Sequence, residues 1–304
     1  KTSDIESLGA KFHGYIDYDK KNDYFVNSDT INSKIKNFVG YFLHGLKLKS
    51  YEFNIYKSKK DKKLVSINVI GDKNKLSKME DFQSLKQIDG LEMSSISADL
   101  YENGRDDLAL FYFSKGANYA TLTTSNSITS EFIPWNNNSH KTIIKGLLVN
   151  TKNANTFTGP DGHKALKEIA GEISQQLSKK QNEDEDHPKK ILDDEILFGC
   201  TGTIGEKYPT DKIKKSIPNL IDKIKYTQNK LIWLKAALGI MTTDTKPKIA
   251  MEECEIGSKN IKLYGLAKGS GMIFPNMATT LGYIFTDADI SNEILYKLLK
   301  KNIE

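Results

Sequence analysis

A run of small and polar residues from Gly265 to Leu281 contains the residue types best suited to chemistry in this chain. Its lysine, Lys268, is followed by Gly269 and Gly271, and glycine permits positive φ angles or a close backbone approach to a ligand. A Gly-Ser-Gly turn beside a lysine could cradle a phosphate. However, the run lacks the Lys-Ser/Thr ending of a P-loop and the helix that follows one, so this signal is weak. Spacing alone favours a tight turn that enters a buried strand.

Three further segments combine threonine, asparagine and glycine in short runs. They are Leu148–Gly159, Gly199–Gly205 and Met241–Lys248, which read Leu-Val-Asn-Thr-Lys-Asn-Ala-Asn-Thr-Phe-Thr-Gly, Gly-Cys-Thr-Gly-Thr-Ile-Gly and Met-Thr-Thr-Asp-Thr-Lys-Pro-Lys. Taken alone, Thr201-Gly202 is most simply an ordinary strand-to-loop turn. In this order, however, the three segments and the run Lys268–Thr279 resemble the sequence motifs of the ornithine acetyltransferase family. The resemblance covers about residues 91–304.

The resemblance implies that the chain cleaves itself and that Thr279 is its nucleophile. In the family, the precursor breaks between the residues that correspond to Ala278 and Thr279, and the freed threonine becomes N-terminal. A threonine hydroxyl needs a base to take its proton, and an N-terminal threonine carries one in its own α-amino group. Because such a group has a pKa of about 7.7 to 8.0, a useful fraction is neutral near neutral pH. Before cleavage, the same hydroxyl would attack the Ala278 carbonyl.

The resemblance also assigns the groups around the nucleophile. Thr201 and Gly202 would form the oxyanion hole, which stabilises the negative charge that develops during acyl transfer. Thr242 and Lys268, together with Thr279, would hold the acylated amino acid, because lysine is a suitable charge partner for a carboxylate. Without the resemblance, a surface lysine is at least as good an interpretation of Lys268.

The family's reaction transfers an acetyl group from N-acetylornithine to glutamate by a ping-pong mechanism, in arginine biosynthesis. We therefore expect an acetyl-Thr279 intermediate in this chain. Some members also accept acetyl-CoA as the acetyl donor, and the resemblance implies no metal and no tightly bound cofactor. Two alternatives stay open. One is a hydrolase or aminopeptidase-like enzyme, in which water resolves the acyl-threonine, and the other is a truncated, non-catalytic scaffold.

Apolar periodicity predicts an α/β fold. Buried strands are expected at 108–113, 143–149 and 281–285, and amphipathic helices at 166–177, 213–224 and 291–299. Thr210 or Asp211 is the expected N-cap of the second helix, and the charged stretch 179–188 is expected to be a surface loop. The resemblance implies more specifically an α/β sandwich related to self-processing aminopeptidases.

A change in amino-acid composition near residue 90 predicts two regions. Residues 1–90 are an added N-terminal region whose role the sequence does not indicate, and its clearest predicted element is a hairpin of Tyr51–Ile55 and Val65–Val69. Residues 91–304 are the expected acyltransferase domain, in which 91–278 corresponds to the family's first subunit and 279–304 to the start of its second. Because the family continues well beyond this point, we expect a C-terminal segment or second subunit, and a hetero-tetramer of two cleaved pairs.

Composition excludes several other classes of protein. The net charge of +5 arises from 44 basic and 39 acidic residues spread thinly along 304 positions. The lysine-rich stretch Lys57–Lys63 is better interpreted as a solvated turn than as a site for an anionic partner. We therefore expect neither a nucleic-acid partner nor a membrane partner. No apolar window approaches the roughly 18 residues of a membrane span, and the N-terminal stretch does not resemble a signal peptide, which favours the cytoplasm.

The remaining polar and sulfur-containing residues suggest no second chemistry. Cys200 and Cys254 are too few for a disulfide framework, and Cys200 is interpreted as a buried small hydrophobe. Asn153 and Asn155 are expected to satisfy backbone groups in a turn. The histidines show no metal-ligand spacing; they are His13, His44, His140, His163 and His187.

Overall fold

The computed structural model describes residues 2–18, 23–27, 42–43, 46, 66–70, 86–138, 142–181, 190–225, 228–270 and 279–302. The chain divides into two compact units, Lys1–Leu85 and Lys86–Glu304. None of the described helices is long and apolar enough to cross a membrane.

The described part of the first unit includes one long helix and two short strands. Helix α1 spans Thr2–Tyr18, and strands β1 (Asp23–Asn27) and β2 (Ser66–Ile70) pair in parallel. The second arm of the predicted hairpin coincides with β2, but the described partner of β2 is the parallel strand β1. The first arm, Tyr51–Ile55, lies outside the described residues.

A four-stranded sheet forms the centre of the second unit. Its order is β3 (Leu91–Ile96), β4 (Leu108–Asn118), β5 (Ile143–Asn150) and β6 (Ile196–Cys200). The first three strands are antiparallel, whereas β5 and β6 are parallel. Parallel neighbours need a long crossover connection, and helix α6 (Gly159–Gln181) lies within it. All five residues of β6 are buried, as expected for a strand covered on both faces.

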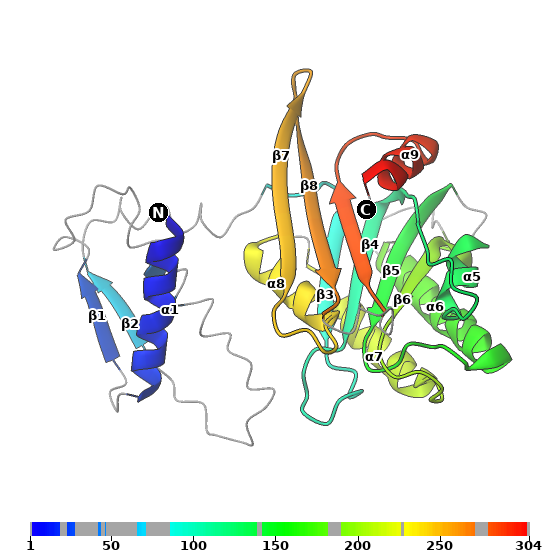
Figure 1. Cartoon of the computed structure of the whole chain (residues 1–304), viewed down its shortest axis with the longest axis horizontal. Helices are drawn as coiled ribbons and strands as arrows, with labels where there is room; N and C mark the ends of the chain where they lie inside the picture. Colours follow the sequence, from blue (N-terminus) through cyan, green and yellow to red (C-terminus); the bar gives the residue numbers. More distant parts are fainter. Residues whose placement is uncertain are drawn as a thin grey trace. The chain divides into compact units, whose positions relative to one another are not determined.

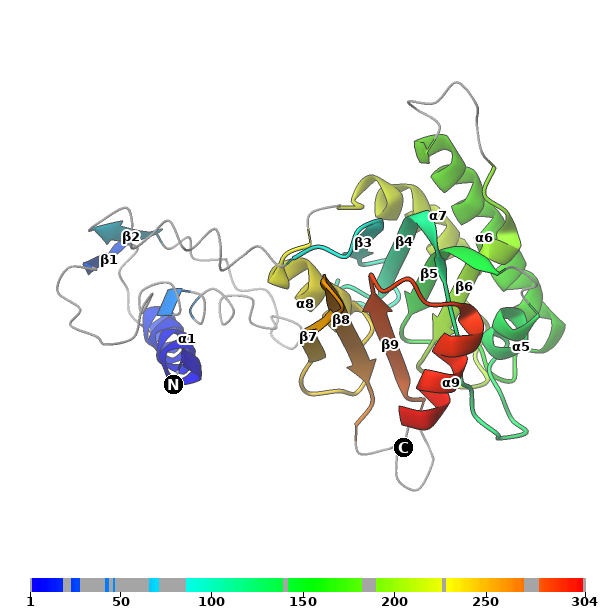
Figure 2. The same ribbon diagram turned by 90° about the horizontal axis from the view of Figure 1, so that it is seen from above.

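A second, antiparallel sheet has the order β7 (Lys248–Ile256), β8 (Lys259–Lys268) and β9 (Leu281–Thr286). Figure 1 shows β7 and β8 as a long hairpin, with β9 beside them. In Figure 2, which shows the structure from above, this sheet is drawn below the four-stranded sheet. The final helix, α9 (Asn292–Asn302), follows β9.

Helices cover the opposite face of the four-stranded sheet. Figure 2 shows α6 and α7 (Thr210–Asp222) on the side of that sheet away from the three-stranded one. Helix α8 (Lys230–Gly239) packs against strands of both sheets. The short elements α5 (Phe132–Asn137) and η3 (Asp193–Glu195) complete this layer. The unit is therefore an α/β sandwich, as the sequence predicts.

Aromatic side chains join the two sheets. The ring of Phe111 on β4 stacks on that of Phe285 on β9, with centroids 4.8 Å apart. From α8, Trp233 meets Phe285 and Tyr264 edge-on, at 5.5 and 5.4 Å. Large aromatic rings contribute most of the apolar area that such a contact buries. This contact fixes β9, and with it the residues that precede it, over the four-stranded sheet.

Two local predictions are wrong. Helix α7 begins at Thr210 with Pro209 in the cap position and no capping bond from a side chain, so neither Thr210 nor Asp211 caps it. A proline suits the start of α7 because its missing N–H would have no partner there in any case. The stretch 179–188 is not all loop, because α6 continues to Gln181, while 182–188 lie outside the described residues.

Candidate active site

The pairing of β8 with β9 positions the lysine beside the expected nucleophile. Lys268 is the last residue of β8 and is paired with Leu281, the first residue of β9. Thr279 therefore lies two residues before the strand that runs alongside Lys268. Ala278 lies outside the described residues.

The ammonium group of Lys268 contacts two of the other residues singled out in the sequence. Its Nζ donates to Thr201 Oγ1 at 3.1 Å and to the backbone carbonyl of Thr279 at 3.0 Å. Lys268 is only 3% exposed, so it is not the surface lysine that its residue type alone would suggest. Burying a charged group is costly unless it is paired and hydrogen-bonded. The structure thus brings Thr201 together with Lys268 and Thr279, although it lies 67 residues before Lys268 in the sequence.

Gly202 lies in a conformation and a space that only glycine fits. Its φ angle is 139°, and a Cβ atom added there would lie 2.1 Å from the carbonyl carbon of Lys152. Thr203 N donates to the Lys152 carbonyl at 2.9 Å, which draws the two loops together. Among the described residues, no acceptor is bonded to the amide of Gly202, whereas the amide of Thr201 donates to Asn150 O. Within the described part of the chain, the Thr201 hydroxyl hydrogen and the Gly202 amide are therefore two donors at this turn without a bonded acceptor.

A buried polar network holds the loop that follows β5. Asn150 Nδ2 donates to the carbonyl of Asn153 at 2.9 Å, and Tyr208 Oη donates to Asn150 Oδ1 at 2.7 Å. Burial raises the pKa of Tyr208 well above its ordinary value, so the phenol keeps its proton. Asn153 Nδ2 bonds the carbonyls of residues 206 and 207, and Asn155 Nδ2 bonds that of residue 162. The structural roles predicted for these two asparagines are confirmed.

The two cysteines differ in their exposure. Cys200 is fully buried, and burial raises its pKa to about 12. The thiolate is the reactive form of cysteine, so Cys200 is an inert apolar residue at the end of β6, as predicted. Cys254 is free and exposed on β7.

The Met241–Lys248 segment supplies a buried carboxylate that the sequence analysis did not single out. Asp244 Oδ1 accepts from Gly269 N at 2.7 Å and from Lys248 Nζ at 2.6 Å, and its Oδ2 lies 3.9 Å from Lys268 Nζ. Thr242, expected to hold substrate, is partly exposed, and its amide lies 3.4 Å from Asp244 Oδ2. The Thr242 amide and the Lys268 ammonium therefore face the same carboxylate oxygen.

Close packing at Gly199 brings the β9 strand down onto β6. A Cβ atom added to Gly199 would lie 2.0 Å from Tyr283 Oη. The absence of a side chain therefore lets Tyr283 approach the strand that ends at Thr201. This contact is a further reason why the start of β9 lies over the Thr201-Gly202 turn.

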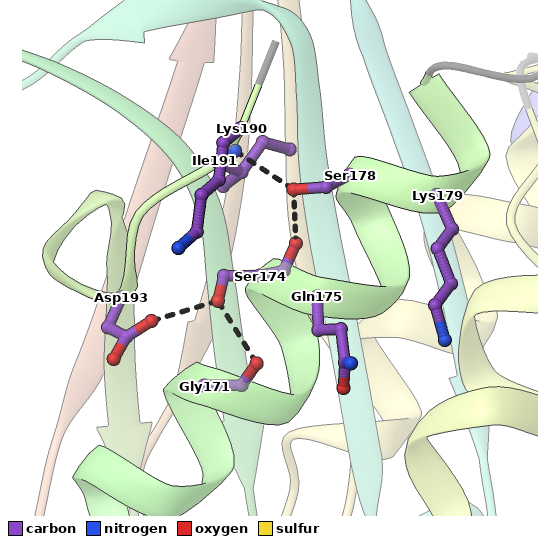
Figure 3. Close-up of a pocket in the computed structure, with 8 residues that line it drawn as sticks. All are labelled: Gly171, Ser174, Gln175, Ser178, Lys179, Lys190, Ile191 and Asp193. Carbon is purple, nitrogen blue, oxygen red and sulfur yellow. Dashed lines mark hydrogen bonds between the residues drawn. The ribbon is translucent and has the colours of Figure 1, made fainter. Parts of the chain in front are cut away.

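A separate hollow of about 550 Å³ lies on α6, lined by eight residues that Figure 3 labels. Its serines already have bonded partners. Ser174 Oγ donates to the Gly171 carbonyl or to Asp193 Oδ1, and Ser178 Oγ donates to the Ser174 carbonyl and accepts from Ile191 N. None of the residues predicted to act in catalysis lines this hollow. Among the described residues, no cluster of metal-ligating side chains occurs there or elsewhere.

The second unit of this chain is similar in sequence to a known protein family. The model of the ArgJ family matches residues 92–304, which is nearly the whole of the second unit. The chain belongs to the ArgJ family. The arginine biosynthesis bifunctional protein ArgJ of Zymomonas mobilis is 36% identical over 221 residues, and that of Gluconobacter oxydans is 36% identical over 216. These matches cover 71% of this chain but only 49% and 47% of the relatives. The chain thus spans about half the length of the curated relatives.

Solved ArgJ-family structures share the fold. The ArgJ protein of Bacillus halodurans superimposes with a TM-score of 0.54 at 23% identity, over 64% of this chain and 92% of that one. The ornithine acetyltransferase of Mycobacterium tuberculosis, crystallised with ornithine, gives a TM-score of 0.51 at 22% identity, over 66% and 96%. The predicted α/β sandwich is confirmed by these likenesses. No residue before 92 is part of the family match.

Gly202 gives a prediction that tests the packing of the site. Gly202→Ala should destabilise the fold by about 1–3 kcal/mol, because the new methyl group would overlap the Lys152 backbone. Thermal unfolding measures the loss. Gly205→Ala is a matched control, since Gly205 also has a positive φ angle but no atom within 4 Å of an added Cβ. Equal melting temperatures for the two variants would contradict the close approach of the two loops.

Proposed function

We propose that this chain forms the nucleophile-bearing part of an enzyme that transfers an acetyl group from N-acetylornithine to glutamate in arginine biosynthesis. The observation that carries the proposal is the position of Lys268 in an ArgJ-family chain. Its ammonium bonds Thr201 on one side and the Thr279 backbone on the other. A nucleophile, two oxyanion donors and a cation for a carboxylate then share one site.

The nucleophile arises by self-cleavage. In the uncut chain, Thr279 Oγ1 attacks the Ala278 carbonyl, and the acyl group moves from the Thr279 nitrogen to its oxygen. Water then hydrolyses the ester, which leaves Ala278 with a carboxylate and Thr279 with a free α-amino group. The carbonyl that Lys268 bonds belongs to Thr279 and is not broken. The same bond can therefore anchor the nucleophile before and after cleavage.

Acetyl transfer then proceeds in two halves. The α-amino group of Thr279 takes the hydroxyl proton as Oγ1 attacks the acetyl carbonyl of N-acetylornithine. The Thr201 hydroxyl and the Gly202 amide donate to the resulting oxyanion. The α-ammonium returns its proton to the departing amine, so ornithine leaves and acetyl-Thr279 remains. In the second half, the amine of glutamate attacks the ester, and N-acetylglutamate leaves as Thr279 regains its hydroxyl.

The site holds its substrate through charge. Among the described residues, the Lys268 ammonium donates two hydrogen bonds, and its third N–H is the proposed donor to the substrate carboxylate. Thr242 is the proposed second contact. No tightly bound cofactor or metal enters the reaction, and acetyl-CoA can serve as an alternative acetyl donor in the first half.

The proposal includes a completing segment, either covalently continuous or a second subunit, and a hetero-tetramer of two cleaved pairs. Strand β9 lies at a sheet edge and presents Ile284, which is 65% exposed. Ile294 and Leu298 on α9 are also exposed. An edge strand with apolar side chains favours pairing with a further strand.

In the same scheme, residues 91–278 and 279–304 belong to different chains after cleavage, and residues 1–90 form an addition outside the catalytic domain.

The fate of the acetyl group tests the reaction. With labelled N-acetylornithine and glutamate, we expect the label in N-acetylglutamate. If the label appeared only in free acetate, the enzyme would be a hydrolase, and if no label left the donor, the chain would be a scaffold. Either of these results would overturn the proposal.

The pH dependence tests the role of Lys268. Burial lowers its pKa below the ordinary value of 10.5, although Asp244 opposes the shift. Rising pH should therefore remove the charge, and with it the hold on the substrate carboxylate, earlier than for an exposed lysine. We expect kcat/KM for the donor to fall with a midpoint below 10.5.

This experiment is best done on the reverse reaction, with N-acetylglutamate as the acetyl donor, because its side chain does not titrate in the alkaline range. In a ping-pong reaction, kcat/KM for the donor reports the first half alone. Activity that stays constant through pH 10.5 would contradict the role assigned to Lys268.

A further inference from the structure

Asp244 is the most completely enclosed charged group at the candidate site. Its side chain is 0% exposed, and Lys268, with a side-chain exposure of 3%, lies 3.9 Å away. The carboxylate accepts from Lys248 Nζ and Gly269 N through Oδ1, and it faces the amide of Thr242 through Oδ2. It therefore touches both segments that are proposed to hold the substrate, one before β7 and one after β8.

The charges of Asp244 and Lys268 support each other. Burial alone would raise the pKa of Asp244, but the bonds from Lys248 and Gly269 N and the charge of Lys268 outweigh it and hold that pKa below its ordinary value. Burial lowers the pKa of Lys268, whereas Asp244 raises it and Lys248 lowers it further. The charge of Asp244, 3.9 Å from Lys268 Nζ, thus favours the ammonium form of Lys268 inside the protein.

The ammonium form of Lys268 matters because it determines where the hydroxyl hydrogen of Thr201 points. A hydroxyl oxygen that accepts a hydrogen bond from an ammonium cannot direct its own hydrogen at the same group. Since Lys268 Nζ donates to Thr201 Oγ1, the Thr201 hydrogen must turn elsewhere, and it becomes available to an oxyanion. A neutral, displaced Lys268 could instead accept that hydrogen and remove the donor.

We propose that Asp244 is a positioning residue of acetyl transfer, which acts through Lys268 on both the Thr201 donor and the substrate carboxylate. It touches neither the substrate nor the reacting atoms. Its contribution is the charge that fixes Lys268 and the bond that fixes the backbone at Gly269. This inference rests on the proposed function for its kinetic consequence, but its electrostatic part is independent of it.

The kinetic test compares Asp244→Asn with Lys248→Gln in the full-length protein. Asparagine keeps the shape of Asp244 and an acceptor for Gly269 N, but it removes the charge. We expect kcat/KM for N-acetylornithine to fall on the order of 10- to 100-fold, the range seen when outer partners that orient metal ligands are removed. Both kcat and KM should change, because donor orientation and carboxylate binding both depend on Lys268. A fall in kcat at constant KM would contradict the proposed effect of Asp244 on binding of the substrate carboxylate.

Lys248→Gln is the matched control, because Lys248 is 47% exposed and contacts the other oxygen of the same carboxylate. It should lose less than threefold, as befits a solvent-screened ion pair. Equal losses in the two variants would overturn the proposal.

A second measurement needs no enzyme activity. In protein with isotopically labelled lysine, NMR follows the titration of the Lys268 side chain, which is assigned by its absence in Lys268→Arg. Asp244→Asn should lower the midpoint of that titration, and Lys248→Gln should raise it. An unchanged midpoint in Asp244→Asn would overturn the proposal. If the two variants shifted the Lys268 midpoint in these opposite directions but the protein transferred no acetyl group, the electrostatic link would be upheld and the proposed reaction rejected. Failure of this inference and failure of the proposed function are therefore distinguishable.

Discussion

Thr279→Ala is expected to leave one uncut polypeptide that forms no acetyl-enzyme and transfers no acetyl group. The substitution removes the hydroxyl that attacks Ala278 in the precursor and the acetyl carbonyl in the mature enzyme. No other group can supply both functions in the proposed scheme, so the loss of turnover should reach the detection limit. A denaturing gel shows whether the chain is cut, and mass spectrometry shows whether acetyl is bound.

The neighbouring threonine provides the control. Thr280 is exposed and has the same side chain, so Thr280→Ala should be cut and should turn over normally. Thr279→Ser should retain partial function, because it keeps the hydroxyl. Normal cleavage of Thr279→Ala would remove this residue from the mechanism.

Thr201→Ala is expected to lower kcat by on the order of 10² to 10³, the usual consequence of losing one oxyanion donor. The fold should survive, because the backbone amide that pairs with Asn150 remains. Steady-state kinetics measures the loss. KM should change less than kcat, since the bond to the oxyanion forms only in the transition state.

Two variants separate the hydroxyl from the turn that carries it. Thr201→Ser restores a hydroxyl that Lys268 can bond, so most of the activity should return. Thr203→Ala removes an exposed threonine from the same turn and should have little effect. If Thr201→Ala kept its kcat, the oxyanion would have to be stabilised elsewhere.

Much of the fold of the second unit could be predicted from apolar periodicity. The predicted strands at 108–113, 143–149 and 281–285 lie within β4, β5 and β9, and the predicted helices correspond to α6, α7 and α9. These segments carry continuous or regularly spaced apolar residues, which burial on one or both faces requires. Strands β7 and β8 were not predicted, because β7 is largely exposed and rich in glutamate. These two strands form because they pair with each other, and their sequences lack the apolar pattern that would predict them.

The limits of the sequence are clearest at the site. Thr201 and Lys268 are 67 residues apart, and their contact depends on how β6, β8 and β9 meet. Motif resemblance could select these residues, but no spacing rule could show that the lysine bonds the threonine. Asp244 was missed although it lies inside a recognised motif. Its partners at Lys268 and Gly269 become neighbours only when β7 and β8 pair.

The most direct test of the account is to trap the acetyl group on Thr279. The full-length gene product is incubated with N-acetylornithine that carries an isotopically labelled acetyl group, without glutamate, and is then quenched in acid and digested. We predict a peptide that begins at Thr279 and carries the label, and loss of that label to N-acetylglutamate when glutamate is added before quenching. A chain that remains joined between Ala278 and Thr279, or a Thr279 peptide that never carries the label, would contradict the account.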